Sequence, residues 1–179
     1  MHGVPVSLGT DQAHVDAVTA PMLADLFRDG GFGESLDGAA PILDAGERSH
    51  MRDVAGVTRS LLLLEAIALV ALLLSGRRLR DERARRGRLL LIGAGLVGAL
   101  AVAGGLFFAL SFDAAFAVFH SLFFKAGTWQ FGPDSNLIRL FPEPFWFQAA
   151  LLAGASIVLG ALLATIAARR DLRAPARGD

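Results

Sequence analysis

Hydrophobic residues are gathered into three long stretches that polar segments separate. The stretches cover residues 57–75, 89–111 and 145–168. A helix needs about 20 largely apolar residues to cross a bilayer, so each stretch is long enough. With 54% hydrophobic residues and 20 glycines, the chain is too apolar for an ordinary soluble domain of its length. The pattern predicts an all-α fold, a polytopic membrane bundle of three transmembrane helices.

The charged residues are sorted by segment. Arginine dominates the loop at residues 76–88 and the tail at 169–179, which predicts that both are cytoplasmic. Residues 1–56 and 112–144 carry a net acidic charge, which predicts that both are extracytoplasmic. A long polar region is difficult to translocate ahead of the first helix, so two alternatives are open: a fourth transmembrane helix upstream of Met1, or translocation of the acidic region on its own.

The first polar centre lies at the outer end of the first stretch. Asp44 is a good N-cap with Glu47 three residues later, a capping box that predicts an unbroken helix to Ser75. Glu47, His50 and Asp53 follow at intervals of three, so we expect them to project from one side of this helix. A carboxylate can then hold the imidazole in one tautomer. The alternative is a solvated helix end in which Glu47 only caps.

The second polar centre lies in residues 112–124, where phenylalanines recur every three or four positions. This spacing predicts a short amphipathic helix along the membrane interface. His120 falls within the aromatic face, which is an unusual place for a titratable group without a partner. We expect His50 and His120 to meet at the outer surface of the bilayer. A histidine that reaches toward the lipid headgroups is the alternative.

A loop at residues 129–146 follows and contains the turn sequence Gly-Pro-Asp-Ser-Asn. We expect it to cover the site. The alternative for its tryptophan and arginine is an interfacial aromatic belt and a solvated charge. The candidate substrate-binding residues of the loop and the preceding helix are Trp129, Asn136, Arg139, Phe116 and Phe123.

Three motifs together resemble a family of small bacterial integral membrane proteins that includes the lipoprotein intramolecular transacylase. They are ERSHMRDV at 47–54, FHSLFF at 119–124 and WQFGPDSNLIRLFPEPFW at 129–146. The resemblance covers residues 44–168. It implies a fold of four membrane helices with an extracytoplasmic portion between the first two, to which residues 1–43 would belong.

The resemblance also implies an activity, the transfer of the sn-2 acyl chain of a diacylglyceryl-modified lipoprotein to the α-amino group of its N-terminal cysteine. The implied partners are therefore membrane lipid and diacylglyceryl-modified lipoproteins. The resemblance implies that His50 and His120 are catalytic, with roles for Asp53 and Glu47 in the same motif. No cofactor or metal is expected.

Acid/base chemistry suits this reaction, because the substrate supplies both the nucleophile and the ester. We expect His120 to act as the base and His50, oriented by Asp53, as the acid; the reverse assignment and a covalent acyl-histidine remain open. Glu65, inside the first stretch, is a further candidate because a charge there is costly. The sequence has no cysteine, which excludes thiolate chemistry.

Two other classes of function remain open. One is a metal site formed by the two histidines with Glu47 or Asp53. The other is a non-enzymatic membrane partner or assembly protein. Transport is disfavoured because polar groups do not extend across the spans. Nucleic-acid binding is disfavoured because topology explains the arginine cluster.

Overall fold

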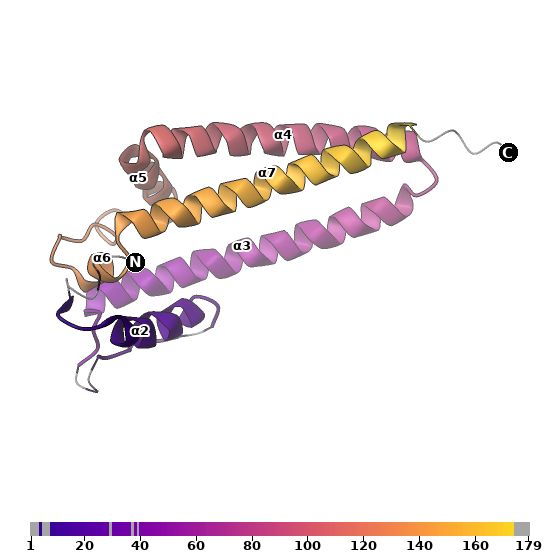
Figure 1. Ribbon diagram of the computed structural model, residues 1–179. Helices are drawn as coiled ribbons and strands as arrows, with labels where there is room; N and C mark the ends of the chain where they lie inside the picture. The colour runs from indigo at the N-terminus through magenta and orange to yellow at the C-terminus, as the bar shows by residue number, and fades with distance from the viewer. Residues whose placement is uncertain (1–3, 5–7, 29, 37, 39, 174–179) are drawn as a thin grey trace. The chain divides into compact units, whose positions relative to one another are not determined.

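The structure is a computed structural model that describes residues 4, 8–28, 30–36, 38 and 40–173. The other residues of the predicted N-terminal region and C-terminal tail lie outside this part. The described residues form helices and no strand (Figure 1). The helices are α2 (Gln12–Asp25), α3 (Ala45–Arg78), α4 (Arg83–Leu110), α5 (Phe112–Phe123), α6 (Asn136–Leu140) and α7 (Glu143–Arg173). The predicted all-α class is confirmed.

Three of these helices, α3, α4 and α7, are long and apolar enough to cross a membrane. Almost none of their apolar side chains is buried within the described residues. In water such exposure would be unfavourable, whereas lipid tails are the solvent that these side chains require. The prediction of three transmembrane helices is therefore confirmed, and the protein is an integral membrane protein.

The chain divides into two compact units. The first contains Met1–Glu65 and Phe116–Trp146, and the second contains Ala66–Ala115 and Phe147–Asp179. The first unit holds the main hydrophobic core, which α2, the segment between α2 and α3, the start of α3, and α6 form together. Its most deeply buried large side chains are Phe32, Met22, Leu43, Leu140 and Val15.

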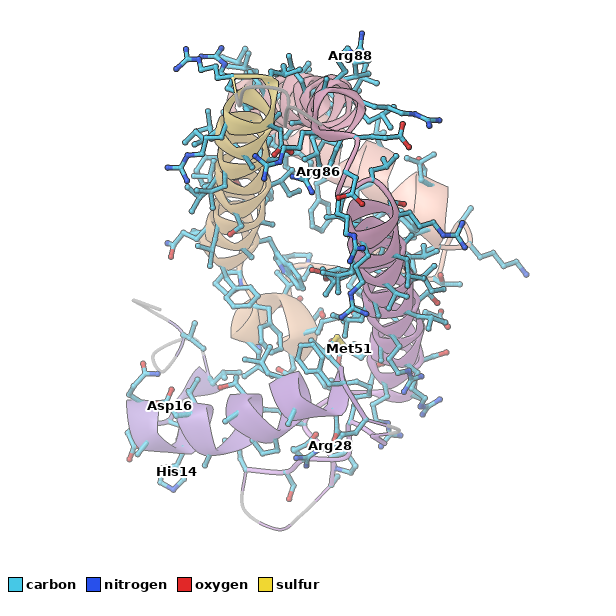
Figure 2. The ribbon with its side chains drawn as sticks, turned by 90° about the vertical axis from the view of Figure 1, so that its right-hand side faces the viewer. His14, Asp16, Arg28, Met51, Arg86 and Arg88 are labelled. Atoms are coloured by element: carbon cyan, nitrogen blue, oxygen red, sulfur yellow. The ribbon has the colours of Figure 1, made fainter. Side chains whose placement is uncertain are left out.

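Helix α2 is an element that the sequence analysis did not predict. The Asp11 side chain caps it by accepting a hydrogen bond from the backbone N–H of His14 at 2.9 Å. Val15, Val18 and Met22 form its buried stripe. Met51 of α3 belongs to the same core, whereas His14 lies on the outer side of α2 (Figure 2).

In the second unit, α4 and α7 lie side by side (Figure 1). The guanidinium of Arg86 donates two hydrogen bonds of 2.6 Å to the carboxylate of Asp171. This half-buried, bidentate ion pair joins the start of α4 to the end of α7. Gly87 follows directly, where a Cβ atom would lie 2.9 Å from the carbonyl oxygen of Ala168. The two backbones approach closely because residue 87 has no side chain.

We predict that Gly87→Ala destabilises the second unit, because the new methyl group would overlap backbone that cannot move aside locally. The expected loss is about 1–3 kcal/mol, as for overpacked cores. Gly93→Ala is the matched control, because a Cβ there meets nothing within 4 Å. Thermal unfolding in detergent measures both. A Gly87→Ala protein as stable as the Gly93→Ala protein would show that the close approach is unimportant.

Candidate active site

His50 lies on the second turn of α3, before the apolar stretch of that helix, and only 5% of its surface is exposed. Its ring packs edge-on against Phe124, with centroids 4.9 Å apart, and lies 5.6 Å from the ring of Phe131. Burial lowers the pKa of His50, proximity to His120 lowers it further, and the charge of Asp53 opposes both effects. The imidazole is therefore neutral at neutral pH.

His120 lies near the end of α5 and is also buried. Its Nδ1 lies 2.8 Å from the carbonyl oxygen of Phe116, one turn earlier. A carbonyl only accepts hydrogen bonds, so Nδ1 carries the proton and donates it, and Nε2 of the neutral ring keeps its lone pair. Burial lowers the pKa of His120, although the hydrogen bond to Phe116 raises it in part. His120 therefore has the tautomer and the charge state of a base.

The two rings lie close together although seventy positions separate them in the sequence. Their centroids are 5.9 Å apart, and the planes are tilted by 30°. Phe124 packs against both rings, at 5.3 Å from His120. The ring centroids of Trp129 and Phe116 lie 4.8 Å and 3.9 Å from that of His120. The two histidines thus lie close together as expected. Phe116, Phe124, Trp129 and Phe131 surround them and form what we call the aromatic enclosure.

Glu47 is almost completely buried, with 2% of its surface exposed. Its carboxylate accepts a 2.8 Å hydrogen bond from the backbone N–H of Asp44, and the Asp44 side chain accepts one from the Glu47 N–H. The predicted capping box is therefore confirmed. The other carboxylate oxygen accepts hydrogen bonds from the Ser135 hydroxyl and from the backbone N–H of Leu137. Glu47 thus joins the start of α3 to the start of α6.

The carboxylates do not orient His50 as the sequence spacing led us to expect. Nδ1 of His50 is buried without a hydrogen-bond partner in the part of the chain that the structure describes. Glu47 directs one oxygen to the backbone of Asp44 and the other to the start of α6, and Asp53 is exposed. Each step of three residues turns a side chain by about 60° around the helix axis, so Glu47 and Asp53, six positions apart, point in directions that differ by about 120°. Asp53 consequently influences His50 through its charge alone.

The candidate substrate-binding residues divide into two groups. Phe116 and Trp129 contact His120 directly, and Phe123 lines a neighbouring groove. Asn136 instead donates a hydrogen bond of 2.8 Å to the carbonyl of Ile42. The guanidinium of Arg139 pairs with Asp134 at 3.2 Å. The first of these last two contacts joins α6 to the segment before α3, and the second lies within the loop.

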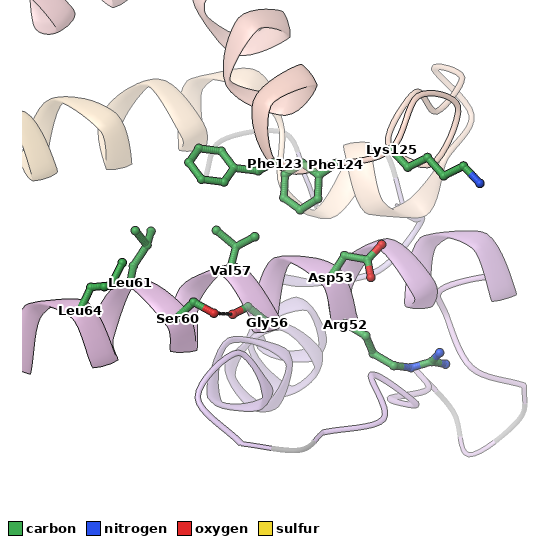
Figure 3. Close-up of a pocket in the computed structure, with 10 residues that line it drawn as sticks. All are labelled: Arg52, Asp53, Gly56, Val57, Ser60, Leu61, Leu64, Phe123, Phe124 and Lys125. Atoms are coloured by element: carbon green, nitrogen blue, oxygen red, sulfur yellow. Dashed lines mark hydrogen bonds between the residues drawn. The ribbon is translucent and has the colours of Figure 1, made fainter.

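A groove of about 660 Å³ adjoins the aromatic enclosure, between α3 and the end of α5 (Figure 3). Charged side chains gather at one end and apolar side chains at the other (Figure 3). Phe124 lines the groove and also contacts both histidines, so the groove begins beside the imidazole pair. Its lining residues are Arg52, Asp53, Gly56, Val57, Ser60, Leu61, Leu64, Phe123, Phe124 and Lys125.

Some residues of the site were missing from the sequence-based candidates. Phe131 and Ser135 lie in an irregular loop where no periodicity marks a buried position, although the proximity of the loop motif to the histidine motifs was a signal. Glu65 is exposed and does not line the groove. Among the described residues, no three histidine, aspartate or glutamate side chains are grouped to hold a metal ion.

Comparison with known proteins gives one family and one fold. A family model described as "Lipoprotein intramolecular transacylase Lit" matches residues 27–146. The structure is similar to that of the membrane-integral lipoprotein intramolecular transacylase Lit from Bacillus cereus, with a TM-score of 0.80 at 20% sequence identity. The match covers 96% of this chain and 78% of that chain.

Two further structures of the Bacillus cereus protein carry a histidine-to-arginine and a histidine-to-alanine mutation. Both match with a TM-score of 0.72 at 20% sequence identity, and both matches cover 96% of this chain. The match covers 75% of the arginine mutant's chain and 76% of the alanine mutant's chain. No curated protein matches the sequence.

We predict that Phe124→Ala raises the pKa of both histidines toward the ordinary value, because water would then reach the rings. In the folded protein a lowered histidine pKa means that the unfolded chain binds protons first as the pH falls below about 6.5. Folding stability therefore decreases with falling pH in that range, and it should decrease less in the variant. NMR titration of ring-labelled histidine measures the pKa directly.

The matched control is Phe27→Ala, which removes a phenylalanine that is 61% exposed in the same unit. Its histidine titrations should equal those of the unmodified protein. Equal titrations in Phe124→Ala would contradict the assignment of the shifts to burial.

We predict that Glu47→Gln destabilises the first unit by about 1–3 kcal/mol, because its amide group would face an N–H or O–H donor in place of a carboxylate oxygen. The substitution retains the size of the side chain. Chemical unfolding followed by tryptophan fluorescence measures the change, since Trp129 and Trp146 both belong to this unit. Unchanged stability would show that the buried carboxylate does not hold α3 and α6 together.

Proposed function

Because this chain belongs to the lipoprotein intramolecular transacylase family, we propose that it moves an acyl chain within a diacylglyceryl-modified lipoprotein through its two buried histidines. The chain is an acyltransferase of the membrane by its family and its fold. The observation that carries the histidine assignment is the imidazole pair, with ring centroids 5.9 Å apart in an aromatic enclosure. At that separation, one reacting carbonyl can lie within hydrogen-bond reach of both rings.

The reaction begins when the α-amino nitrogen of the N-terminal cysteine attacks the carbonyl carbon of the sn-2 ester. Nε2 of His120 takes the proton that the nitrogen loses as the C–N bond forms, since its lone pair is available in the tautomer that Phe116 selects. The tetrahedral intermediate then breaks its bond to the glyceryl oxygen. That oxygen receives the proton from the His120 imidazolium. An amide and a glyceryl hydroxyl result, and no co-reactant is consumed.

In this proposal His50 does not act as the general acid that we expected from the sequence. Burial keeps the ring of His50 neutral, so His50 is not an imidazolium that could act as a general acid when the attack begins. A neutral imidazole is instead a hydrogen-bond donor, and one in a preorganised, dry site stabilises charge that develops on the ester oxygens. The negative charge of Asp53 favours partial positive charge on the His50 ring when the ring donates this hydrogen bond.

The enclosure supports this chemistry in two ways. Exclusion of water from around the rings protects the ester from hydrolysis and strengthens electrostatic interactions in the site. Binding the amine and the ester of one molecule together also replaces a bimolecular encounter by an intramolecular step, which lowers the barrier by several kcal/mol. No side-chain nucleophile is required.

The proposed site faces the extracytoplasmic side. His50 lies near the start of α3, and the arginine-rich segment at residues 77–88 follows the other end of that helix. Arginine-rich loops between membrane helices remain in the cytoplasm, so the histidine end belongs to the opposite surface. The ester linkages of a lipoprotein anchored in that leaflet lie at the same depth.

We predict that His120→Ala and His50→Ala each lower the rate of transacylation about a hundredfold or more, the usual contribution of acid/base and electrostatic groups. The assay uses the full chain in liposomes with a synthetic diacylglyceryl lipopeptide. Mass spectrometry identifies whether nitrogen or oxygen carries the acyl chain.

His14→Ala is the matched control, because His14 is an exposed histidine on α2 outside the enclosure. It should retain the unmodified rate. If both His50→Ala and His120→Ala also retain that rate, the histidine mechanism is wrong. If neither the unmodified protein nor any variant shows transacylation, the alternative of a non-enzymatic membrane partner is favoured.

A further inference from the structure

The groove beside the imidazole pair is charged at one end and apolar at the other, which matches the ester end and the hydrocarbon end of one acyl chain. At one end lie Arg52, Asp53 and Lys125, and at the other lie Leu61, Leu64 and Phe123 (Figure 3). From Asp53 to Leu64 the groove follows α3 for about 16 Å, at the rise of an α-helix. Its volume of about 660 Å³ is within the range of sites for small ligands.

The wall along α3 is less polar than its composition implies. The hydroxyl of Ser60 donates a 2.8 Å hydrogen bond to the carbonyl of Gly56, so it is not available to a ligand. Val57, Leu61 and Leu64 continue along the same side of the helix toward the apolar stretch. An occupant of this end is therefore a hydrocarbon, and it can enter from the bilayer without crossing water.

The charged end adjoins the reacting groups. Phe124 forms part of the groove and contacts both imidazoles. Arg52 and Lys125 carry only hydrogen-bond donors, which suits the carbonyl oxygens of esters and peptides. A ligand with an ester at this end and a chain along α3 would place its carbonyl carbon next to His50 and His120.

We infer that this groove holds the acyl chain that is transferred, with its ester at the Phe124 end and its terminal methyl group along Leu61 and Leu64. The inference rests on the proposed function, and it adds the determinants of acyl-chain length. The ester C–O bond breaks and the amide C–N bond forms at the mouth of the groove, while the hydrocarbon remains in place. Long chains gain binding from the apolar end, whereas short chains do not reach it.

Gly56 gives a direct way to test the groove. It lines the groove, and a Cβ atom built there meets nothing within 4 Å, so a larger side chain can be accepted without moving the backbone. Gly56→Phe would occupy the space in which the chain is proposed to lie. Gly95→Phe is the matched control, since Gly95 is also a helical glycine with open space around it, on α4.

The first measurement is kcat/KM for diacylglyceryl lipopeptides with a palmitoyl or an acetyl group as the transferred acyl group, using the full chain in liposomes. Gly56 lies one helical turn from Asp53, so a palmitoyl chain passes it and an acetyl group does not reach it. Gly56→Phe should therefore lower the palmitoyl value about tenfold or more and leave the acetyl value within about twofold. Gly95→Phe should leave both values unchanged. No loss in Gly56→Phe, or an equal loss for both substrates, overturns the inference.

The second measurement does not depend on turnover. A lipopeptide with a photoreactive diazirine at the end of its acyl chain should label Leu61 or Leu64, and Gly56→Phe should abolish the labelling. If a phospholipid with the same diazirine labels these residues equally and the lipopeptide does not compete, the groove is ordinary lipid-facing surface and the inference fails. Absence of turnover in the unmodified protein would reject the proposed function alone, because this labelling would still report on the groove.

Discussion

The buried carboxylate of Glu47 is the interaction on which the arrangement of the site depends. A charged group in such a position must be paired or fully hydrogen-bonded, because the cost of leaving it desolvated is several kcal/mol. Its donors come from Asp44, Ser135 and Leu137, and so from both sides of the site. Meeting this requirement brings the start of α6 to the start of α3. The loop that precedes α6 is thereby held next to His50, with Phe131 against its ring.

The aromatic enclosure has a consequence for chemistry as well as for packing. Imidazole rings among phenylalanine and tryptophan lose the hydration that would stabilise their charged forms, so the pKa values of His50 and His120 are both lowered. Neutral imidazoles can accept a proton from an amine and can donate a hydrogen bond to an ester oxygen. The hydrogen bond to the Phe116 carbonyl decides which nitrogen of His120 is the acceptor. Fold and proton chemistry therefore depend on the same contacts.

Much of the architecture was accessible from the sequence because it follows from local rules. Apolar length predicted the membrane helices, and the Asp44–Glu47 capping box predicted the start of α3 at Ala45. The recurrence of phenylalanine predicted α5. Helix α2 was not predicted, because its buried stripe is short and Pro21 interrupts the pattern. Helix α6 is too short for periodicity to identify, and its place is set by the contact with Glu47.

The sequence by itself determined the three membrane helices, and it predicted that the two histidines lie near the same surface of the membrane, since hydropathy and arginine content are properties of single segments. Only the tertiary structure decided what each polar side chain contacts. Glu47 bonds to α6, Asp53 remains exposed, and Asn136 bonds to the carbonyl of Ile42, although the sequence suggested another role for each. The physical reason is that these partners lie about ninety positions apart in the sequence. Helical periodicity restricts the direction of a side chain, but the segment that it meets depends on how the whole core packs.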